Sequence, residues 1–213
     1  MKINSELKMI IGIVMVCAVL LGAFIWFAPK GGNGVTADLN LLVRENSEMT
    51  GKFGAKVTLV EFADFECPAC ATVSPYVKKV ADLYKDNPDF NFVYRHFPLS
   101  QHANAVISAE ASEAAGAQGK FWEMAEMLYK NQAEWSAVSN PTEIFVGYAK
   151  ILNLDTTKFK SDLDQHLFLS KVQADLKDAV SLNLRQTPSL FLNGVEVTDI
   201  GSLQSQIDIE LVK

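Results

Sequence analysis

The fold of this chain is decided by residues 57–70, VTLVEFADFECPAC, in which an apolar run leads directly into a pair of cysteines. The run is rich in β-branched and aromatic side chains, and it predicts a buried strand over residues 57–62. The residues after the cysteines predict a helix over 72–84. Pro68 suits the first turn of that helix, where its missing N–H costs nothing. The two cysteines therefore lie at a junction between a strand and a helix.

The spacing of the cysteines favours redox chemistry. Residues three apart in a helix share a face, so Cys67 would lie at the helix N-terminus and Cys70 one turn deeper. Free N–H groups and the positive end of the helix dipole stabilise a thiolate there. We therefore expect the pKa of Cys67 to be depressed and the Cys70 thiol to be shielded.

Two other roles compete with a redox-active dithiol. A structural disulfide is one, although closing so short a loop constrains the unfolded chain only slightly. A zinc half-site is the other, although no paired histidine spacing and no further cysteine of the folded part completes four ligands. The third cysteine, Cys17, lies in an apolar run and is expected to be a packing residue. We predict no metal and no cofactor.

The composition is that of an acidic chain with ample material for a core. The 213 residues are 49% hydrophobic and carry a formal net charge of −6, which suits one domain with an elaboration. Proteins that bind nucleic acid usually carry a basic patch, and none is visible here. We therefore predict no nucleic acid among the partners.

The N-terminal part of the sequence predicts a single transmembrane helix. Residues 9–28 carry no charged side chain, and at about 1.5 Å per residue they can cross a hydrocarbon core of roughly 30 Å. A cleaved signal peptide is the alternative, but no small-x-small site follows the run. Lys2 and Lys8 favour a cytoplasmic location for residues 1–8. The rest of the chain would then lie outside the cytoplasm, where disulfides form.

Beyond the anchor, the patterns predict a linker over 29–50, with a short strand near 41–44, and then alternating elements. Residues 90–97 predict the next strand, and Asn193-Gly194 between two apolar runs predicts a hairpin. Helical periodicity fills most of the sequence between them. The helical faces that we expect to be buried comprise Phe121, Met124, Ala125 and Leu128; Ile144, Tyr148 and Ile151; Leu169, Val172, Leu176 and Val180; and finally Leu203, Ile207 and Leu211.

This order of elements predicts an α/β fold with a thioredoxin-like mixed sheet flanked by helices. A strand–helix–strand unit implies a parallel pair with a right-handed crossover, and the hairpin adds antiparallel strands. Residues 51–100 and 185–213 would form the thioredoxin-like domain, and residues 101–184 would form an all-helical insertion. One transmembrane helix would precede the whole.

Four segments carry a resemblance to a known family. They are VEFADFECPAC at 60–70, YRHFPL at 94–99, GKFWEM at 119–124 and TPSLFLNG at 187–194. In this order, around a helical insertion, they resemble the DsbA-like thiol–disulfide oxidoreductases, in particular the membrane-anchored bacterial branch. The resemblance covers the chain from about residue 51 to the C-terminus.

The resemblance implies a role for each matching residue. Cys67 would be the nucleophile, and Pro188 would follow a cis peptide bond and face the active site. Glu61 would be the family's buried acidic residue, passing protons to and from Cys70; a carboxylate that reaches water at the strand end is the alternative. The backbone of Thr187 would pair with an extended substrate chain.

Substrate would also contact Pro68 and Ala69, the dipeptide between the cysteines. This Pro-Ala dipeptide is a departure from the Pro-His of the best-known members, and Gln186 replaces a glycine that many relatives carry before the Thr-Pro pair. Since the imidazole is absent and Glu66 adds a nearby negative charge, we expect a less extreme depression of the Cys67 pKa than in Pro-His relatives.

These features predict an enzyme, a protein thiol–disulfide oxidoreductase, that introduces disulfides into exported proteins. It would be a single-pass protein of the cytoplasmic membrane of a bacterium, with reduced or unfolded exported proteins as substrates and a membrane redox partner that reoxidises it. A reductase or isomerase of the same fold is the nearest alternative, and a non-catalytic binding module is another.

Several other residues are expected to be structural. We assign neither His96 nor His102 to catalysis, and we expect Phe121, Trp122 and Trp135 to pack in the core of the helical block.

Overall fold

The computed structural model describes residues 37–213. The predicted cytoplasmic segment 1–8, the anchor 9–28 and the first part of the linker therefore lie outside the described residues. Within residues 37–213, the helices lack the combination of length and apolar character that a membrane span requires.

A mixed sheet of five strands, in the order β1-β3-β2-β4-β5, forms the centre of the fold. The central strand β2 pairs in parallel with β3 and antiparallel with β4. The described strands are β1 (Glu48–Met49), β2 (Val57–Ala63), β3 (Phe90–His96), β4 (Ser189–Leu192) and β5 (Val195–Glu196). The predicted strands at 57–62 and 90–97 and the predicted hairpin are confirmed.

The hairpin between β4 and β5 shows why the sequence signal was strong. Asn193 and Gly194 both have positive φ, +47° and +85°, which a tight hairpin turn requires and which these two residue types tolerate best. The side chain of Asn193 also accepts a hydrogen bond from the backbone N–H of Thr58 in β2. The turn is thereby fastened to the central strand.

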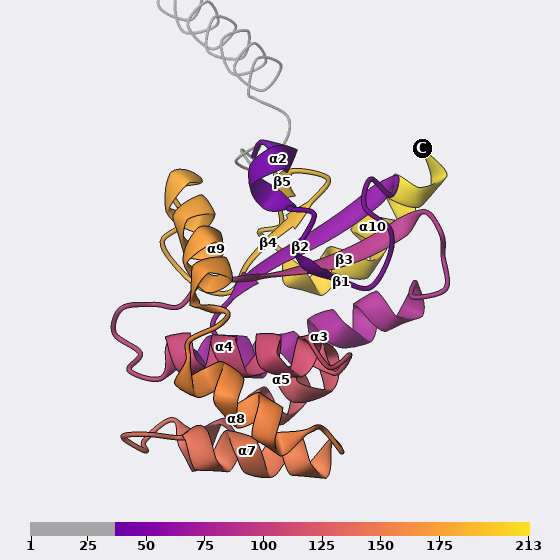
Figure 1. The fold of residues 1–213 in the computed structure, drawn as a ribbon. Coiled ribbons are helices and arrows are strands. Elements are labelled where there is room, and N and C mark those ends of the chain that lie inside the picture. Colours follow the sequence, from indigo (N-terminus) through magenta and orange to yellow (C-terminus); the bar gives the residue numbers. More distant parts are fainter. Residues whose placement is uncertain (1–36) are drawn as a thin grey trace, which may run out of the picture. The chain divides into compact units, whose positions relative to one another are not determined.

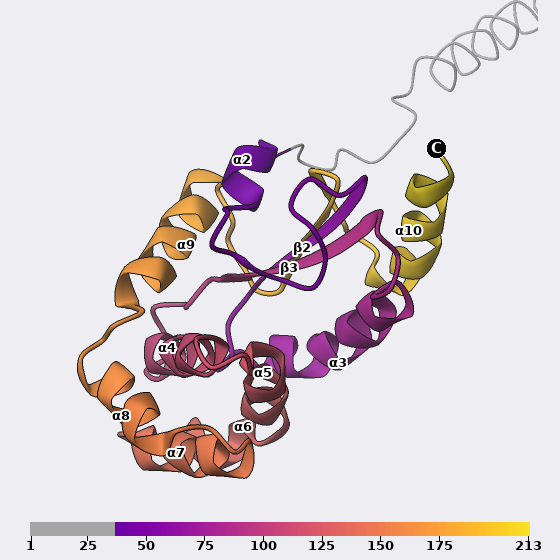
Figure 2. The ribbon, with the colours of Figure 1, turned by 45° about the vertical axis from the view of Figure 1, so that its right-hand side comes forward.

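The helices surround the sheet, as Figures 1 and 2 show. Helix α3 (Pro68–Leu83) connects β2 to β3, and six helices lie in the sequence between β3 and β4. The other described helices are α2 (Leu39–Leu42), α4 (Ala105–Gly116), α5 (Phe121–Lys130), α6 (Gln132–Trp135), α7 (Thr142–Ile151), α8 (Thr156–Asp164), α9 (Leu169–Ser181), the short 3-10 turn η1 (Ile200–Ser202) and α10 (Leu203–Val212).

Alternation along β2 assigns its side chains to two cores. Val57 and Leu59 pack with residues of α3 and α10 on one face of the sheet. Val60 and Phe62 pack with residues of α2 and α9 on the other face. Helices therefore cover both faces, as predicted. A third core joins α4, α5 and α7 to the end of β2, and it contains both Cys67 and Cys70.

Part of the predicted linker belongs to the folded unit. Residues 41–44 were expected to include a short strand, and this expectation is wrong, because Leu39–Leu42 form α2. The side chain of Asp38 caps this helix by accepting a hydrogen bond from the N–H of Asn40 at 2.9 Å. Residues 48 and 49 form β1 at the edge of the sheet, paired with β3.

Two of the predicted helical faces are displaced. In α7 the buried residues are Phe145, Tyr148 and Ala149, whereas Ile151 is 66% exposed. In α9 Val172 is buried as expected, but Val180 is 61% exposed. The face predicted for α5 is confirmed, since Phe121, Met124, Ala125 and Leu128 are its buried residues. Among the expected core aromatics, Phe121 and Trp135 are buried and Trp122 is half-buried.

Candidate active site

The cysteine pair lies where the sequence predicted it, at the N-terminus of α3. Cys67 is the residue that caps the helix, and Cys70 lies in the first turn. Both are free thiols, with Cys67 7% exposed and Cys70 fully buried. Pro68 and Ala69 between them are exposed. A thiol that approaches from solvent across this dipeptide therefore reaches Cys67 and not Cys70.

The two thiols have opposite acid–base properties. A hydrogen bond from the Cys70 side chain is the largest influence on Cys67, and it lowers the pKa of Cys67 to about 5 against the opposing effect of burial. The backbone N–H groups of Cys70 and Ala69 lower that pKa further. The same thiol pair and burial raise the pKa of Cys70 far above its ordinary value. The expected depression is present, and its largest cause is Cys70 rather than the helix end.

The Thr187-Pro188 peptide bond is cis, as the resemblance implied. The carbonyl oxygen of Thr187 accepts a hydrogen bond from the Sγ of Cys67 at 3.6 Å. Thr187 is buried, and its Oγ1 has no partner within the described residues. The start of β4 is thus brought against the nucleophile, although the roles assigned to Thr187 and Pro188 in substrate binding stay predictions.

Glu61 lies in β2 on the face that α3 covers. Its side chain is enclosed, with the whole residue 2% exposed, and Oε1 accepts a hydrogen bond from Ser74 Oγ of α3 at 3.3 Å. Burial raises the pKa of Glu61 to about 7. The carboxyl group can therefore hold or release a proton near neutral pH.

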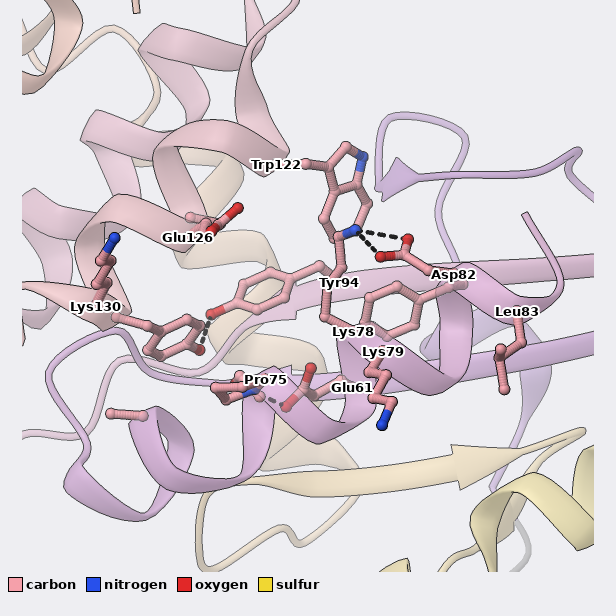
Figure 3. A pocket seen from close by; sticks show the side chains of 15 residues that line it. Glu61, Pro75, Lys78, Lys79, Asp82, Leu83, Tyr94, Trp122, Glu126 and Lys130 are labelled. Atoms are coloured by element: carbon pink, nitrogen blue, oxygen red, sulfur yellow. Dashed lines mark hydrogen bonds and ion pairs between the residues drawn. The ribbon is translucent and has the colours of Figure 1, made fainter. Parts of the chain in front are cut away.

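A cavity of about 670 Å³ lies beside Glu61, between α3 and α5. Figure 3 shows that Glu61, Tyr94 and Trp122 line this cavity, together with several lysines. Tyr94 and Tyr129, which also lines the cavity, join their hydroxyl groups at 2.8 Å. The lining of the cavity is mainly apolar, but the Glu61 carboxyl group and the Tyr94 and Tyr129 hydroxyl groups are among its residues and supply the polar partners that water molecules need. The cavity offers the buried carboxyl group a route to solvent.

The turn before Cys67 is fixed by Asp64, which is 2% exposed. Asp64 Oδ1 accepts from the N–H of Glu66, and Oδ2 accepts from the N–H of Leu99 at 2.9 Å and lies 2.7 Å from Nδ1 of His102. His102 therefore holds the turn and touches neither sulfur through a hydrogen bond, which agrees with the structural role expected for it.

Glu66 does not simply point into water, because its Oε2 accepts a hydrogen bond from the N–H of Asn104 at 2.6 Å. Burial raises the pKa of Glu66. The negative charge expected next to Cys67 is thus partly offset by hydrogen bonding to the insertion and by easier protonation.

A residue that the sequence did not single out also reaches this turn. The side-chain amide of Gln132, at the start of α6, donates hydrogen bonds to the carbonyl oxygens of Phe65 and Cys67. No periodicity or motif marks a lone glutamine 65 positions away from Cys67, so only the folded chain shows the contact.

Comparison with known proteins gives one family and one fold. Residues 44–209 match the family model described as Thioredoxin. Oxidised BdbD from Bacillus subtilis superposes with a TM-score of 0.73 at 23% identity, covering 85% of this chain and 100% of the other. A thioredoxin-like oxidoreductase from Silicibacter pomeroyi gives 0.66 at 25% identity, with 83% and 99% covered. α-DsbA1 from Wolbachia pipientis gives 0.68 at 21% identity, with 83% and 98% covered.

The similar proteins in the curated set are named as Na⁺/H⁺ antiporters and not as oxidoreductases. The Na⁺/H⁺ antiporter NhaA 1 of Mycolicibacterium vanbaalenii is 36% identical over 175 residues, which are 80% of this chain but 27% of the antiporter. The chain thus spans about a quarter of the length of the curated relatives it matches. The solved neighbours, in contrast, are covered almost completely, and they confirm the DsbA-like fold.

Proposed function

Because this chain belongs to the thioredoxin family, whose fold it shares with DsbA-like thiol–disulfide oxidoreductases, we propose that it oxidises thiols of exported proteins with its Cys67–Cys70 pair. One observation carries this proposal. Two free thiols lie at the N-terminus of α3: Cys70 is fully buried, Cys67 is 7% exposed beside the exposed Pro68-Ala69 dipeptide, and the Cys70 thiol lowers the pKa of Cys67 to about 5. At neutral pH Cys67 is therefore a thiolate, while Cys70 stays protonated.

The reaction begins from the oxidised enzyme, in which Cys67 and Cys70 share a disulfide. A substrate thiolate attacks the Sγ of Cys67, so a bond forms between substrate and Cys67 and the Cys67–Cys70 bond breaks. Cys70 leaves with the electron pair and takes a proton. A second substrate thiolate then attacks the first substrate sulfur, and Cys67 leaves as a thiolate. Two substrate thiols are oxidised, and the enzyme disulfide is reduced to the dithiol.

Glu61 supplies the proton that Cys70 needs. The pKa of Glu61 at about 7 keeps a substantial fraction of it protonated at neutral pH, and its negative charge raises the pKa of Cys70. After the proton transfer, water in the adjoining cavity can restore the protonated carboxyl group. This route leaves the exposed side of Cys67 free for the substrate.

The pKa values favour the oxidising direction. A stabilised thiolate at Cys67 stabilises the reduced enzyme, so the enzyme disulfide is the stronger oxidant, and Cys67 is the better leaving group. A reductase would need a less stabilised thiolate, whereas an isomerase also uses a stabilised thiolate and differs in acting from the reduced dithiol. The non-catalytic alternative is disfavoured by a complete dithiol in which one sulfur is shielded and the other faces the exposed Pro-Ala dipeptide.

The proposed location is the outer side of a bacterial cytoplasmic membrane, with residues 9–28 as the anchor and a membrane redox partner as the oxidant that restores the disulfide. The match to chains named as Na⁺/H⁺ antiporters supports a place for this kind of unit at a membrane. Ion transport itself is not part of the proposal, because the matched part is a quarter of those proteins and coincides largely with a thioredoxin unit.

The test is the reduction potential of the full-length protein, equilibrated against glutathione and followed by the fluorescence of its tryptophans. An oxidase should lie above about −200 mV, whereas a value near the roughly −270 mV of thioredoxin would contradict the oxidising direction. In parallel, the oxidised protein should form disulfides in a reduced unfolded substrate, and the Cys67→Ala variant should not.

A further inference from the structure

The helical insertion reaches the nucleophile through one side chain. Gln132 lies at the first position of α6, and its Nε2 is 2.7 Å from the carbonyl oxygen of Phe65 and 3.0 Å from that of Cys67. Carbonyl oxygens only accept hydrogen bonds, so the NH₂ end of the amide has to face them. The orientation of the amide is therefore fixed by its two partners.

These two carbonyl groups define where α3 begins. Cys67 caps the helix without a side-chain hydrogen bond of its own, and its carbonyl oxygen accepts the first helical bond, from the N–H of Ala71 at 3.1 Å. The Phe65 carbonyl lies on the other side of Glu66. By binding both, Gln132 holds the backbone on each side of Glu66 and with it the direction of the first helical N–H groups.

Gln132 is itself held firmly. Trp135, one turn along α6, is fully buried, donates from Nε1 to the carbonyl of Leu128 at 2.9 Å and packs edge-on against Phe145. Asn104 completes the connection: its side chain donates to the carbonyls of Trp135, Ser136 and Val138, and its backbone N–H donates to Glu66. α6 and the turn before Cys67 are thus tied together at two points.

We propose that Gln132 is a positioning residue for the nucleophile: its carboxamide holds the Phe65 and Cys67 peptide groups so that the first N–H groups of α3 point at the Cys67 sulfur. This inference rests on the proposed function only in taking Cys67 as the reacting thiol. It makes the insertion part of the active site.

Removal of the Gln132 amide should change the apparent pKa of Cys67 as well as the stability of the protein. Without a donor the two carbonyls are free to turn, and the N–H groups of Ala69 and Cys70, which stabilise the thiolate, lose their fixed direction. The apparent pKa of Cys67 should then rise by about half a unit to one unit, which is the effect of losing about one hydrogen bond to the thiolate. A purely structural residue would lower stability without this rise.

The experiment compares the full-length protein with its Q132A, Q132E, Q132M and Q118A variants in the reduced state. Each is treated with iodoacetamide over a range of pH. Modification at Cys67 is quantified by tandem mass spectrometry, whose fragment ions separate Cys67 from Cys70 in the tryptic peptide of residues 57–78 that contains both. Q118A is the matched control, because the Gln118 amide also forms two hydrogen bonds to backbone atoms, both of Asp155, in the same helical region.

The expected result is a raised apparent pKa of Cys67 in Q132A and an unchanged value in Q118A. Q132E keeps the shape of the side chain but turns carboxylate oxygens toward two carbonyls, so its rise should exceed that of Q132A. Because the added negative charge raises this pKa by itself, Gln132→Met, which keeps the length of the side chain without a charge or a donor, decides the matter if Q132A does not fold. An unchanged apparent pKa in every folded Gln132 variant would overturn the proposal. A low reduction potential of the wild type would count against the oxidase role but not against this positioning.

Discussion

The sulfur of Cys67 lies 3.6 Å from the carbonyl oxygen of Thr187, a residue 120 positions further along the chain. The contact joins the strand–helix junction to the segment that enters β4, on the far side of the helical insertion. Only the protonated thiol can donate to this carbonyl, so in the thiolate and in a mixed disulfide the carbonyl is available to a donor of the substrate. The site is therefore assembled only when both halves of the thioredoxin unit are in place.

The acidity of Cys67 should depend on Cys70. In the reduced wild type, alkylation of Cys67 should titrate with an apparent pKa near 5, the value to which the Cys70 hydrogen bond lowers it. Cys70→Ala removes this donor and should raise the midpoint, whereas Cys70→Ser keeps a hydroxyl donor and should raise it less. The measurement is the pH dependence of the iodoacetamide rate at Cys67. A wild-type midpoint at or above about 8.5, the value for a free cysteine, would contradict the site as described.

Glu61 should destabilise the reduced protein at neutral pH. Its pKa is raised from 4.5 to about 7 by burial, so between these values the unfolded chain releases a proton that the folded chain keeps. Wild-type stability should fall as the pH rises through this window, by up to about 3 kcal/mol, and Glu61→Gln should not show that loss. Urea unfolding at pH 4 and pH 8 measures it. The two proteins should have the same free energy of unfolding at pH 4, and Glu61→Gln should be more stable at pH 8. If the free energy of unfolding changes equally with pH in both proteins, the raised pKa of Glu61 is refuted.

Filling the cavity should slow proton delivery to Cys70. Ala125 is buried and lines the cavity beside Glu61, so Ala125→Leu adds apolar volume where water would otherwise approach the carboxyl group. We expect slower reduction of the Cys67–Cys70 disulfide by glutathione in stopped-flow experiments, with unchanged alkylation of reduced Cys67. Ala117→Leu, at an exposed alanine after α4, serves as the control. Equal rates of disulfide reduction in the wild type and both variants would show that the cavity takes no part in proton delivery to Cys70.

The buried ion pairs of Arg95 should matter for stability more than exposed pairs do. Arg95 has no exposed surface, and it bonds to Asp175 and Asp178 of α9. Arg95→Met leaves two buried carboxylates with fewer partners and should cost about 3–5 kcal/mol. Lys120→Ala breaks an ion pair with Glu123 in which both side chains are more than 40% exposed, and it should change stability by less than about 1 kcal/mol. Denaturant titration of the reduced proteins compares them.

Much of the fold could be predicted from local sequence. The β-branched run of β2 and the Asn193-Gly194 turn each favour one backbone conformation, so their sequence patterns were enough to predict the strand and the hairpin. The sequence around α2 was ambiguous, because its apolar residues suit a strand as well as a helix, and the capping bond from Asp38 decides for the helix.

Helical faces and distant contacts were harder to predict. In α7, Ile144, Tyr148 and Ile151 have helical spacing, and so do Phe145, Tyr148 and Ala149; the neighbouring helices select the second set. In α9 the spacing of the aliphatic residues predicted the wrong buried face at Val180. Asp175 and Asp178 are buried there instead, because both pair with Arg95.

The candidate site divides in the same way. Cys67 and Cys70 are neighbours in sequence and could be assigned from their spacing, whereas the bonds from Ser74 to Glu61 and from Gln132 to Cys67 exist only after folding. The acidity of Cys67 was predicted in direction, but its main cause, the thiol of Cys70, depends on how the first turn of α3 places the two sulfurs.

The sheet ends on both sides in strands of two residues, β1 and β5. An edge strand exposes unpaired N–H and C=O groups on which another extended chain can add, and short edges limit this kind of self-association. A protein proposed to meet unfolded chains would encounter many such extended segments. Because the edge strands of its sheet, as described over residues 37–213, are so short, few backbone groups are available for such segments to pair with. This would favour release of substrate chains over aggregation with them.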